Sequence, residues 1–196
     1  MHVEIERRFL VDGRSHRPWK DASERVEDLE QWYLDPEVLA ISGVDRTVLQ
    51  HDRVPMIHDL SHEDRTIIEE REGWVVRIRR SGATWWLTLK GRRVGASAVE
   101  LEWPIESGVG ARVTQHHLGS VCKTRYHWRD EAGLVWHIDE MEGPLAGIII
   151  AEVELDEADQ VIEVPAWAGM ELTHLHNWSN HSLARMQRIG DEMAAP

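Results

Sequence analysis

The sequence predicts a mainly β fold in which about eight short antiparallel strands form a barrel or a sandwich with few helices. Short runs of alternating apolar and polar residues recur along the chain, and glycine-containing turns join several of them. Charged residues of one sign also recur at alternate positions within these runs, where they share one face of a strand. The 196 residues are enough for one domain with a substantial core.

The first predicted strand lies at the N-terminus and reads MHVEIERRFLV. At the two-residue period of a strand its apolar side chains share one face, while Glu4, Glu6 and Arg8 share the other. A half-buried antiparallel strand whose polar face meets water explains such a pattern in a single strand. The interpretation therefore depends on whether other strands repeat it.

Further strands and helices follow at short intervals. Strands are predicted at 30–34, 74–80, 85–90, 98–105, 121–129, 134–141 and 147–156. The strands on either side of 81–84 form a hairpin around a glycine-containing loop, and so do those on either side of 130–133. Helices are predicted at 109–118 and 156–162, and a longer one at 179–193 has apolar residues at helical spacing.

The charged face of the first strand recurs on most of the other strands. Paired charges are Arg77 with Arg79, Glu100 with Glu102, Lys123 with Arg125, and Glu152 with Glu154, and single charges stand at Lys90 and Asp139. Like charges at alternate positions repel each other, so another group must offset them. If the sheet closes with these faces inward, the carboxylates suit a divalent metal, and the guanidinium and ammonium groups suit phosphate. We therefore expect a charged tunnel where a small barrel normally has an apolar interior.

Composition limits the partners and the location of the protein. The formal charge is −13 and the pI is about 5.3, which argues against duplex nucleic acid or an anionic membrane surface as a partner. A small anionic substrate is compatible with this negative net charge, because a local basic cluster or a bound metal can reverse the electrostatic potential around it. A homodimer is also compatible with the composition. The lone cysteine, Cys122, and the lack of a signal-peptide or membrane-span pattern favour the cytoplasm. By phase, Cys122 faces away from the tunnel and is expected to be packed.

The ordered set of segments resembles the CYTH superfamily of triphosphate tunnel metalloenzymes. The resemblance starts at EIERRFLV and continues through QWYL, RIRR, TLKG, the Glu100 and Glu102 pair, KTRY, the strand ending in Asp139, EVE and SNHSLA. It covers nearly the whole chain apart from residues 36–72. The resemblance implies a single domain over 1–196, an antiparallel barrel tunnel that binds triphosphate compounds with Mg²⁺ or Mn²⁺.

The resemblance also implies a role for each charged residue. The metal-binding carboxylates that it implies are Glu4, Glu6, Glu152 and Glu154, with Asp139, Glu100 and Glu102 as further acidic lining. The phosphate-binding residues that it implies are Arg8, Arg77, Arg79, Lys90, Lys123 and Arg125. The catalytic residues that it implies are Arg8 and Tyr33.

The implied function is metal-dependent hydrolysis of a triphosphate, with inorganic tripolyphosphate as the expected substrate. The alternatives are a class IV-like adenylate cyclase and a polyphosphate- or nucleotide-binding module without turnover. Arg8 replaces the family's lysine and cannot act as a base near neutral pH, so we expect it to stabilise charge. Two further departures are His137, where many members have Glu, and His176, which stands in LHNWSN where the family often has a basic residue.

Residues 36–72 form an insertion relative to short members of the family. The insertion mixes short apolar runs with prolines and with His51, His58 and His62, and Ser61 followed by Asp64 indicates the start of a helix. Long links in compact domains are commonly lids or mobile segments, and acidic and histidine side chains disfavour a dry core position. We expect the insertion to pack beside a tunnel mouth and to limit access by longer substrate chains, and its histidines to be loop side chains.

Overall fold

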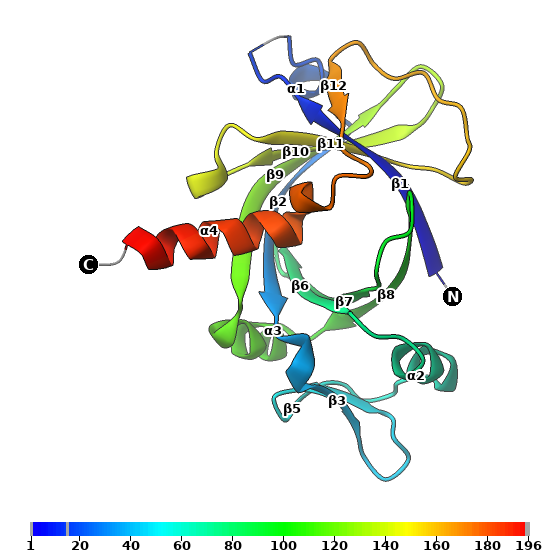
Figure 1. The fold of residues 1–196 in the computed structure, drawn as a ribbon, viewed down its shortest axis with the longest axis vertical. Coiled ribbons are helices and arrows are strands. Elements are labelled where there is room, and N and C mark those ends of the chain that lie inside the picture. The colour runs from blue at the N-terminus through cyan, green and yellow to red at the C-terminus, as the bar shows by residue number, and fades with distance from the viewer. Residues whose placement is uncertain (1, 15, 195–196) are drawn as a thin grey trace.

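The computed structural model describes residues 2–14 and 16–194, and eight of its strands close into an antiparallel barrel (Figure 1). The barrel strands are β1 (His2–Val11), β2 (Arg25–Leu34), β6 (Val75–Ser81), β7 (Thr84–Lys90), β8 (Ser97–Ile105), β9 (Gly119–Arg129), β10 (Val135–Met141) and β11 (Ile149–Glu154). Their hydrogen-bonded order is β11-β10-β9-β2-β6-β7-β8-β1, and pairing of β1 with β11 completes the ring. The predicted barrel of about eight strands is confirmed.

The barrel strands turn their apolar side chains outward and their charged side chains inward. On β6 and β7, for example, Ile78, Leu87 and Leu89 are fully buried on the outer face. These outer faces would be exposed in an isolated barrel, so the helices and connecting segments cover them. Under one such cover, Trp136 and Val153 pack with Trp19 of α1 (Trp19–Ala22).

The insertion forms a small antiparallel sheet of its own, followed by a helix. Its elements are η1 (Pro36–Val38), β3 (Leu39–Ser42), β4 (Val48–His51), β5 (Val54–Ile57) and α2 (His62–Glu69). The Ser61 side chain accepts a hydrogen bond from the Asp64 amide at 3.0 Å, which confirms the predicted helix start. Figure 1 shows this unit outside the barrel, next to β6, β7 and β8.

The insertion shares a core with the barrel wall, which corrects our expectation that it avoids a dry position. Leu49 is completely buried and belongs to one apolar cluster with Ile68 of the insertion and with Ile78 and Leu87 of the barrel. Even His51 is buried, and its Nε2 lies 3.0 Å from the Asp35 carbonyl oxygen. Alternation of apolar residues over four-residue strands is too short to stand out in the sequence, so this buried face was not predicted.

The C-terminal segment covers one end of the barrel. Here β12 (Ala168–Glu171) pairs with β1, η4 (His176–Trp178) follows, and α4 (Asn180–Ala194) crosses β2 and β9 at the edge of the ring in Figure 1. Leu183 of α4 packs with Val121 and Ile150 in one apolar cluster. The contact is close, because a Cβ at Gly119 would lie 2.7 Å from the Ala184 carbonyl oxygen.

The remaining predicted elements have mixed outcomes. The predicted helix at 109–118 corresponds to α3 (Ser107–Val113) and η2 (Thr114–His116), and the remaining short helix, η3 (Gly143–Leu145), lies between β10 and β11. The predicted helix at 156–162 is wrong, since the Asp156 amide there donates to the Gln160 side chain in a turn.

Cys122 faces away from the cavity as predicted, but it is exposed and not packed. Within the described residues, no helix is both long and apolar enough to cross a membrane.

Candidate functional site

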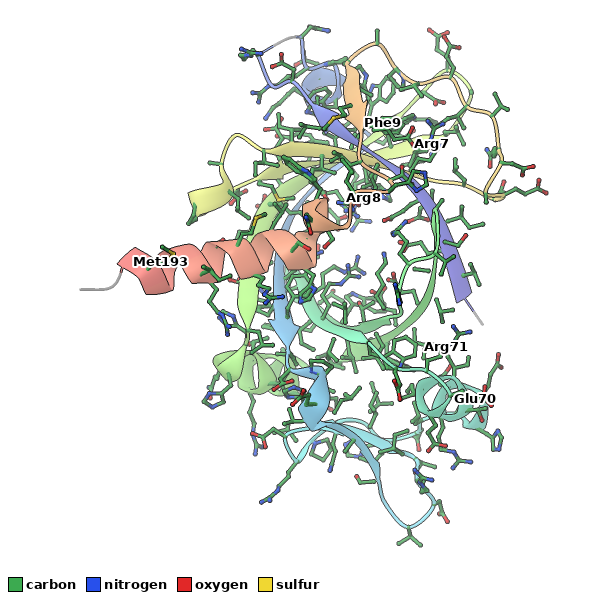
Figure 2. All side chains as sticks on the ribbon, viewed as in Figure 1. Arg7, Arg8, Phe9, Glu70, Arg71 and Met193 are labelled. Carbon is green, nitrogen blue, oxygen red and sulfur yellow. The ribbon has the colours of Figure 1, made fainter. Side chains whose placement is uncertain are left out.

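The barrel encloses a cavity of about 690 Å³ that is lined by side chains from all eight barrel strands. Every site residue predicted from the sequence lines this cavity except Lys123 and Asp139. The residues that line it are Glu4, Glu6, Arg8, Tyr33, Arg77, Arg79, Lys90, Glu100, Glu102, Arg125, Glu152 and Glu154. Figure 2 shows the strand side chains that project into the ring, with Arg8 near the end covered by the C-terminal segment. The two-residue period of the strands thus brings together charges that are far apart in sequence.

Strand register places opposite charges side by side on the wall formed by β6, β7 and β8. Lys90 and Glu100 are direct neighbours across β7 and β8, with Nζ and Oε2 3.2 Å apart. Arg77 Nη2 lies 3.4 Å from Glu100 Oε1, and Arg79 Nη2 lies 3.0 Å from Glu102 Oε2. These cross-strand pairs offset the repulsion within each like-charge doublet.

Two guanidinium groups on this wall retain unused hydrogen-bond donors. Arg77 Nε and Arg79 Nε are both buried, and neither has a hydrogen-bond partner among the described residues. Buried donors in proteins are nearly always paired, so an unpaired donor at a cavity wall is available to an acceptor from outside the chain, either ordered water or a ligand. Phosphate oxygens are strong acceptors for such groups.

On the opposite wall, Arg125 connects β9, β10 and β11. Its guanidinium donates to both Asp139 oxygens at 2.6 and 2.7 Å and to Glu152 Oε2 at 3.0 Å. Burial alone would raise the pKa of Asp139, but the charges of Arg125 and Lys123 outweigh it and hold that pKa below its usual value. The pKa of Glu152 is lowered in the same way, against burial, by Arg125 and Arg8. Both carboxyl groups are therefore ionised near neutral pH.

Lys123 and Asp139 form an ion pair that is buried behind the cavity wall. Their side chains have no exposed surface, and the Lys123 ammonium contacts Asp139 directly. Burial lowers the pKa of Lys123 to about 8, although the charge of Asp139 acts in the opposite direction. The structure therefore places these two residues in support of Arg125 and away from the cavity surface. Alternation predicts which face a residue takes, but not whether another layer covers it.

Carboxylates crowd together along β1 and its neighbours. Burial and the charges of Glu6 and Glu100 raise the pKa of Glu4 to about 8, although Lys90 opposes this shift. Burial and Glu6 likewise raise the pKa of Glu154. No hydrogen bond or ion pair joins Glu154 to another described residue, so its oxygens are available to a ligand.

The donor set of this group fits a hard divalent cation. Carboxylate oxygens are the ligands that Mg²⁺ and Mn²⁺ prefer, and a cation among them would relieve the repulsion that raises the pKa of Glu4. Within residues 2–14 and 16–194, however, no three His, Cys, Asp or Glu side chains converge as metal ligands. Instead, the side chains of Lys90 and Arg93 form ion pairs with Glu4 and Glu6, respectively. The residues fit a metal if these ion pairs exchange for it.

Tyr33 is placed to donate a hydrogen bond and not to act as a base. Burial raises its pKa to about 12, although the charges of Arg77 and Lys90 oppose the shift. Its hydroxyl donates to Gln31 Oε1 at 3.2 Å, and its ring lies 5.1 Å from that of His181 on α4. The phenol thus keeps its proton near neutral pH.

Several residues that line the cavity were not predicted from the sequence. They include Arg92, Arg93, Thr173, Ser179 and His181, which lie in loops or at the start of α4. Such segments have no two-residue period, and only the doubled arginine after TLKG gave a signal for Arg93. His137 also lines the cavity, where burial and Arg125 lower its pKa to about 4, so it is neutral near pH 7. The side chain of His176, named above as a departure from the family, lies outside the described residues.

Comparisons with known proteins agree with this architecture, although no protein-family model matches the chain. The chain is 32% identical over 112 residues to the inorganic triphosphatase of Acetivibrio thermocellus, covering 56% of this chain and 71% of that protein. It is 26% identical over 121 residues to the inorganic triphosphatase of Nitrosomonas europaea, covering 56% and 74%. The crystal structure of the inorganic triphosphatase NE1496 matches with a TM-score of 0.56 and 24% identity, covering 94% of this chain and 96% of that one. The last match shows a shared fold.

Proposed function

Because this chain belongs to the CYTH family of inorganic triphosphatase-like proteins, we propose that it hydrolyses a linear triphosphate with the help of a divalent metal. One observation carries the proposal: a closed barrel cavity combines crowded carboxylates with guanidinium donors that have no partner among the described residues. A metal triphosphate complex supplies both missing parts, namely a cation for the carboxylates and acceptor oxygens for the guanidinium groups.

Arg77 and Arg79 bind the phosphate chain in this proposal, with Lys90 beside them. Their side chains come from adjacent strands of a closed barrel, so the groups are held in place before the substrate arrives. Arg125 adds positive charge from the opposite wall, where Asp139 and Glu152 fix its orientation. Guanidinium groups on both sides offset the charge that develops on the phosphate oxygens during phosphoryl transfer.

Glu4, Glu6 and Glu154 would hold the metal. When bound, a divalent cation supplies charge neutralisation and Lewis acidity at the phosphate oxygens. Glu152 is taken up by Arg8 and Arg125, so we assign it to orienting these cations. Tyr33 keeps its proton near neutral pH and a guanidinium is no general base, so we assign Tyr33 and Arg8 to binding and orienting the substrate.

We propose inorganic tripolyphosphate as the substrate. The two curated relatives are named inorganic triphosphatases, and the cavity wall is dominated by charged side chains. A chain of phosphates alone can be bound by such a wall over its whole length. A nucleotide would in addition need an apolar surface for its base.

The test is phosphate release from tripolyphosphate, ATP and thiamine triphosphate, with Mg²⁺ or Mn²⁺ and with a chelator. We expect release from tripolyphosphate that needs metal, and a loss of at least about tenfold in kcat/KM for Arg77→Ala. Arg112→Ala, which removes an exposed arginine of α3 outside the cavity, is the matched control.

Two other outcomes would contradict the proposal. Cyclic AMP and pyrophosphate formed from ATP, identified by chromatography, would make the protein a cyclase. Tight calorimetric binding of tripolyphosphate without release of phosphate from any of the three compounds would make it a binding module.

A further inference from the structure

The loop between β7 and β8 brings a second cation to the carboxylates of β1. Arg93, in the middle of this loop, contacts the Glu6 carboxylate directly, and its Nη2 lies 4.0 Å from Glu4 Oε2. The Arg93 side chain is only 12% exposed although it comes from a loop. The guanidinium is therefore seated inside the cavity, next to the group that suits a metal.

A short network holds the loop against β1. Arg93 Nη1 donates to the Ala96 carbonyl oxygen at 2.8 Å, and the same oxygen accepts the Glu6 amide at 3.1 Å. Val94 and Ser97 form an isolated bridge around Gly95, whose φ of +61° favours glycine. Because these backbone contacts hold the loop without the Arg93 side chain, the guanidinium can change partners while the barrel hydrogen bonds stay intact.

Arg93 and Lys90 are the cations that pair with Glu4 and Glu6 from the side of β7, but they are anchored differently. Lys90 belongs to a barrel strand and also pairs with Glu100. Arg93 has no carboxylate partner beyond β1 among the described residues. Arg93 uses Glu6 Oε1, so a divalent cation bound through that oxygen competes with the guanidinium for it and repels its charge, which favours displacement of Arg93.

We propose that Arg93 is an exchangeable counter-ion that pairs with Glu6 when no metal is bound and binds the triphosphate once metal has displaced it. The inference rests on the proposed function and adds a substrate-binding residue to it. Its consequence is that Arg93 weakens metal binding to the free protein and strengthens triphosphate binding to the metal-loaded protein. Metal and triphosphate then bind cooperatively, because each favours the same position of the guanidinium.

The first measurement is calorimetric titration of Mn²⁺ into the protein without substrate. We expect Arg93→Ala to bind Mn²⁺ about tenfold more tightly than the parent, since no charge-assisted hydrogen bond has to be broken. Arg112→Ala is the matched control, because Arg112 of α3 carries the same charge, is exposed and lies outside the cavity. At about 0.15 M salt its charge is largely screened, and the expected change is under about twofold.

The second measurement is the affinity for an imido-bridged, non-hydrolysable triphosphate at saturating Mn²⁺. We expect Arg93→Ala to bind it about tenfold more weakly than the parent and Arg112→Ala to bind it nearly as well as the parent. Arg93→Gln, which retains the bulk of the side chain, provides the same comparison if the alanine variant folds poorly by circular dichroism.

Unchanged Mn²⁺ affinity in Arg93→Ala, or equal tightening in both arginine variants, would overturn the inference while the parent still hydrolyses tripolyphosphate. A parent that binds no Mn²⁺ and releases no phosphate would overturn the proposed function, and the inference with it. The two failures are therefore distinguishable.

Discussion

Among single residues, Arg8 connects the opening strand with the C-terminal segment. Its Nε donates to Glu152 at 3.1 Å, Nη2 donates to the Trp178 carbonyl oxygen, and its amide donates to Thr173 Oγ1 at 3.1 Å. Two of these bonds orient the guanidinium and the third fixes the backbone, before any ligand binds. A pre-oriented guanidinium loses little freedom on binding phosphate, which favours a charge-stabilising role.

The role of Arg8 predicts a graded response to substitution. Arg8→Lys keeps the charge and should keep tripolyphosphate affinity within a few-fold of the parent. Arg8→Ala should weaken binding by about 1.5–3 kcal/mol, the value of a charge-assisted hydrogen bond. Calorimetric titration with a non-hydrolysable analogue measures both variants, and thermal unfolding checks that they fold. If Arg8→Ala bound as well as the parent, Arg8 would not be part of the site.

Asp139 predicts a specific acid sensitivity of folding. Its folded pKa is lowered, so its contribution to stability is complete above the unfolded pKa of about 3.9 and is lost as pH falls through the folded value. The unfolding free energy of the parent should therefore fall as pH drops from about 5 to 3, and Asp139→Asn should flatten this slope. At pH 7 that variant should lose about 3–5 kcal/mol, because Lys123 becomes a buried charge with one partner fewer.

Urea unfolding at several pH values measures both effects. Glu131→Gln, which changes an exposed carboxylate in the turn between β9 and β10, is the control and should follow the parent. An Asp139→Asn variant with the parental slope would show that this buried pair does not govern the acid response.

At the scale of secondary-structure elements, strand alternation predicted the site better than the cover of the barrel. The faces of β1, β6, β8 and β11 follow directly from a period of two, because one wrong step would bury every charge in an apolar layer. Lys123 and Asp139 follow the same two-residue period, but other side chains cover them completely. The period predicts which face of a strand a residue occupies, and it does not predict which residues along that face are covered. Arg93 lies in a loop, where no periodicity specifies direction.

The insertion shows the same limit for whole elements. Its three strands have four residues each, so a tertiary partner decides their structure more than local pattern does. Of the whole segment, only its last residue, Glu72, lines the cavity, together with the following Gly73. Most of the insertion is therefore a cover for β6, β7 and β8, and its predicted effect on longer substrate chains has to act through that end.

This structural role predicts that the insertion stabilises the barrel. Leu49→Ala should lower the unfolding free energy by about 2–5 kcal/mol, because Leu49 is completely buried in the shared core. Val44→Ala, at a fully exposed position of the same insertion, should change it by less than about 0.5 kcal/mol. KM for tripolyphosphate should stay at the parental value in both variants. Equal stability of the two variants, measured by urea unfolding, would mean that the insertion packs independently of the barrel.

For the whole molecule, the distribution of charge matters more than its sum. The chain carries a formal charge of −13, yet the cavity is lined by arginine and lysine side chains from four different strands as well as by carboxylates. A free polyanion approaches a molecule of like charge, so it gains little from long-range attraction. A metal-bound triphosphate has less negative charge and brings the cation that the carboxylates attract.

The closed barrel predicts that metal and triphosphate together stabilise the entire fold. All eight strands line the cavity, so a bound complex joins strands that are distant in sequence, and it has no comparable site in the unfolded chain. A non-hydrolysable triphosphate with Mn²⁺ at about 100 times its Kd should add about 2.7 kcal/mol, which raises Tm by about 5–10 °C for a chain of this length. With a chelator present, the same triphosphate should stabilise the fold much less and raise Tm by a smaller amount, because the carboxylates repel it. Differential scanning calorimetry of the parent and of Arg77→Ala measures the effect, and an equal rise in Tm with and without metal would show that the carboxylates take no part in binding.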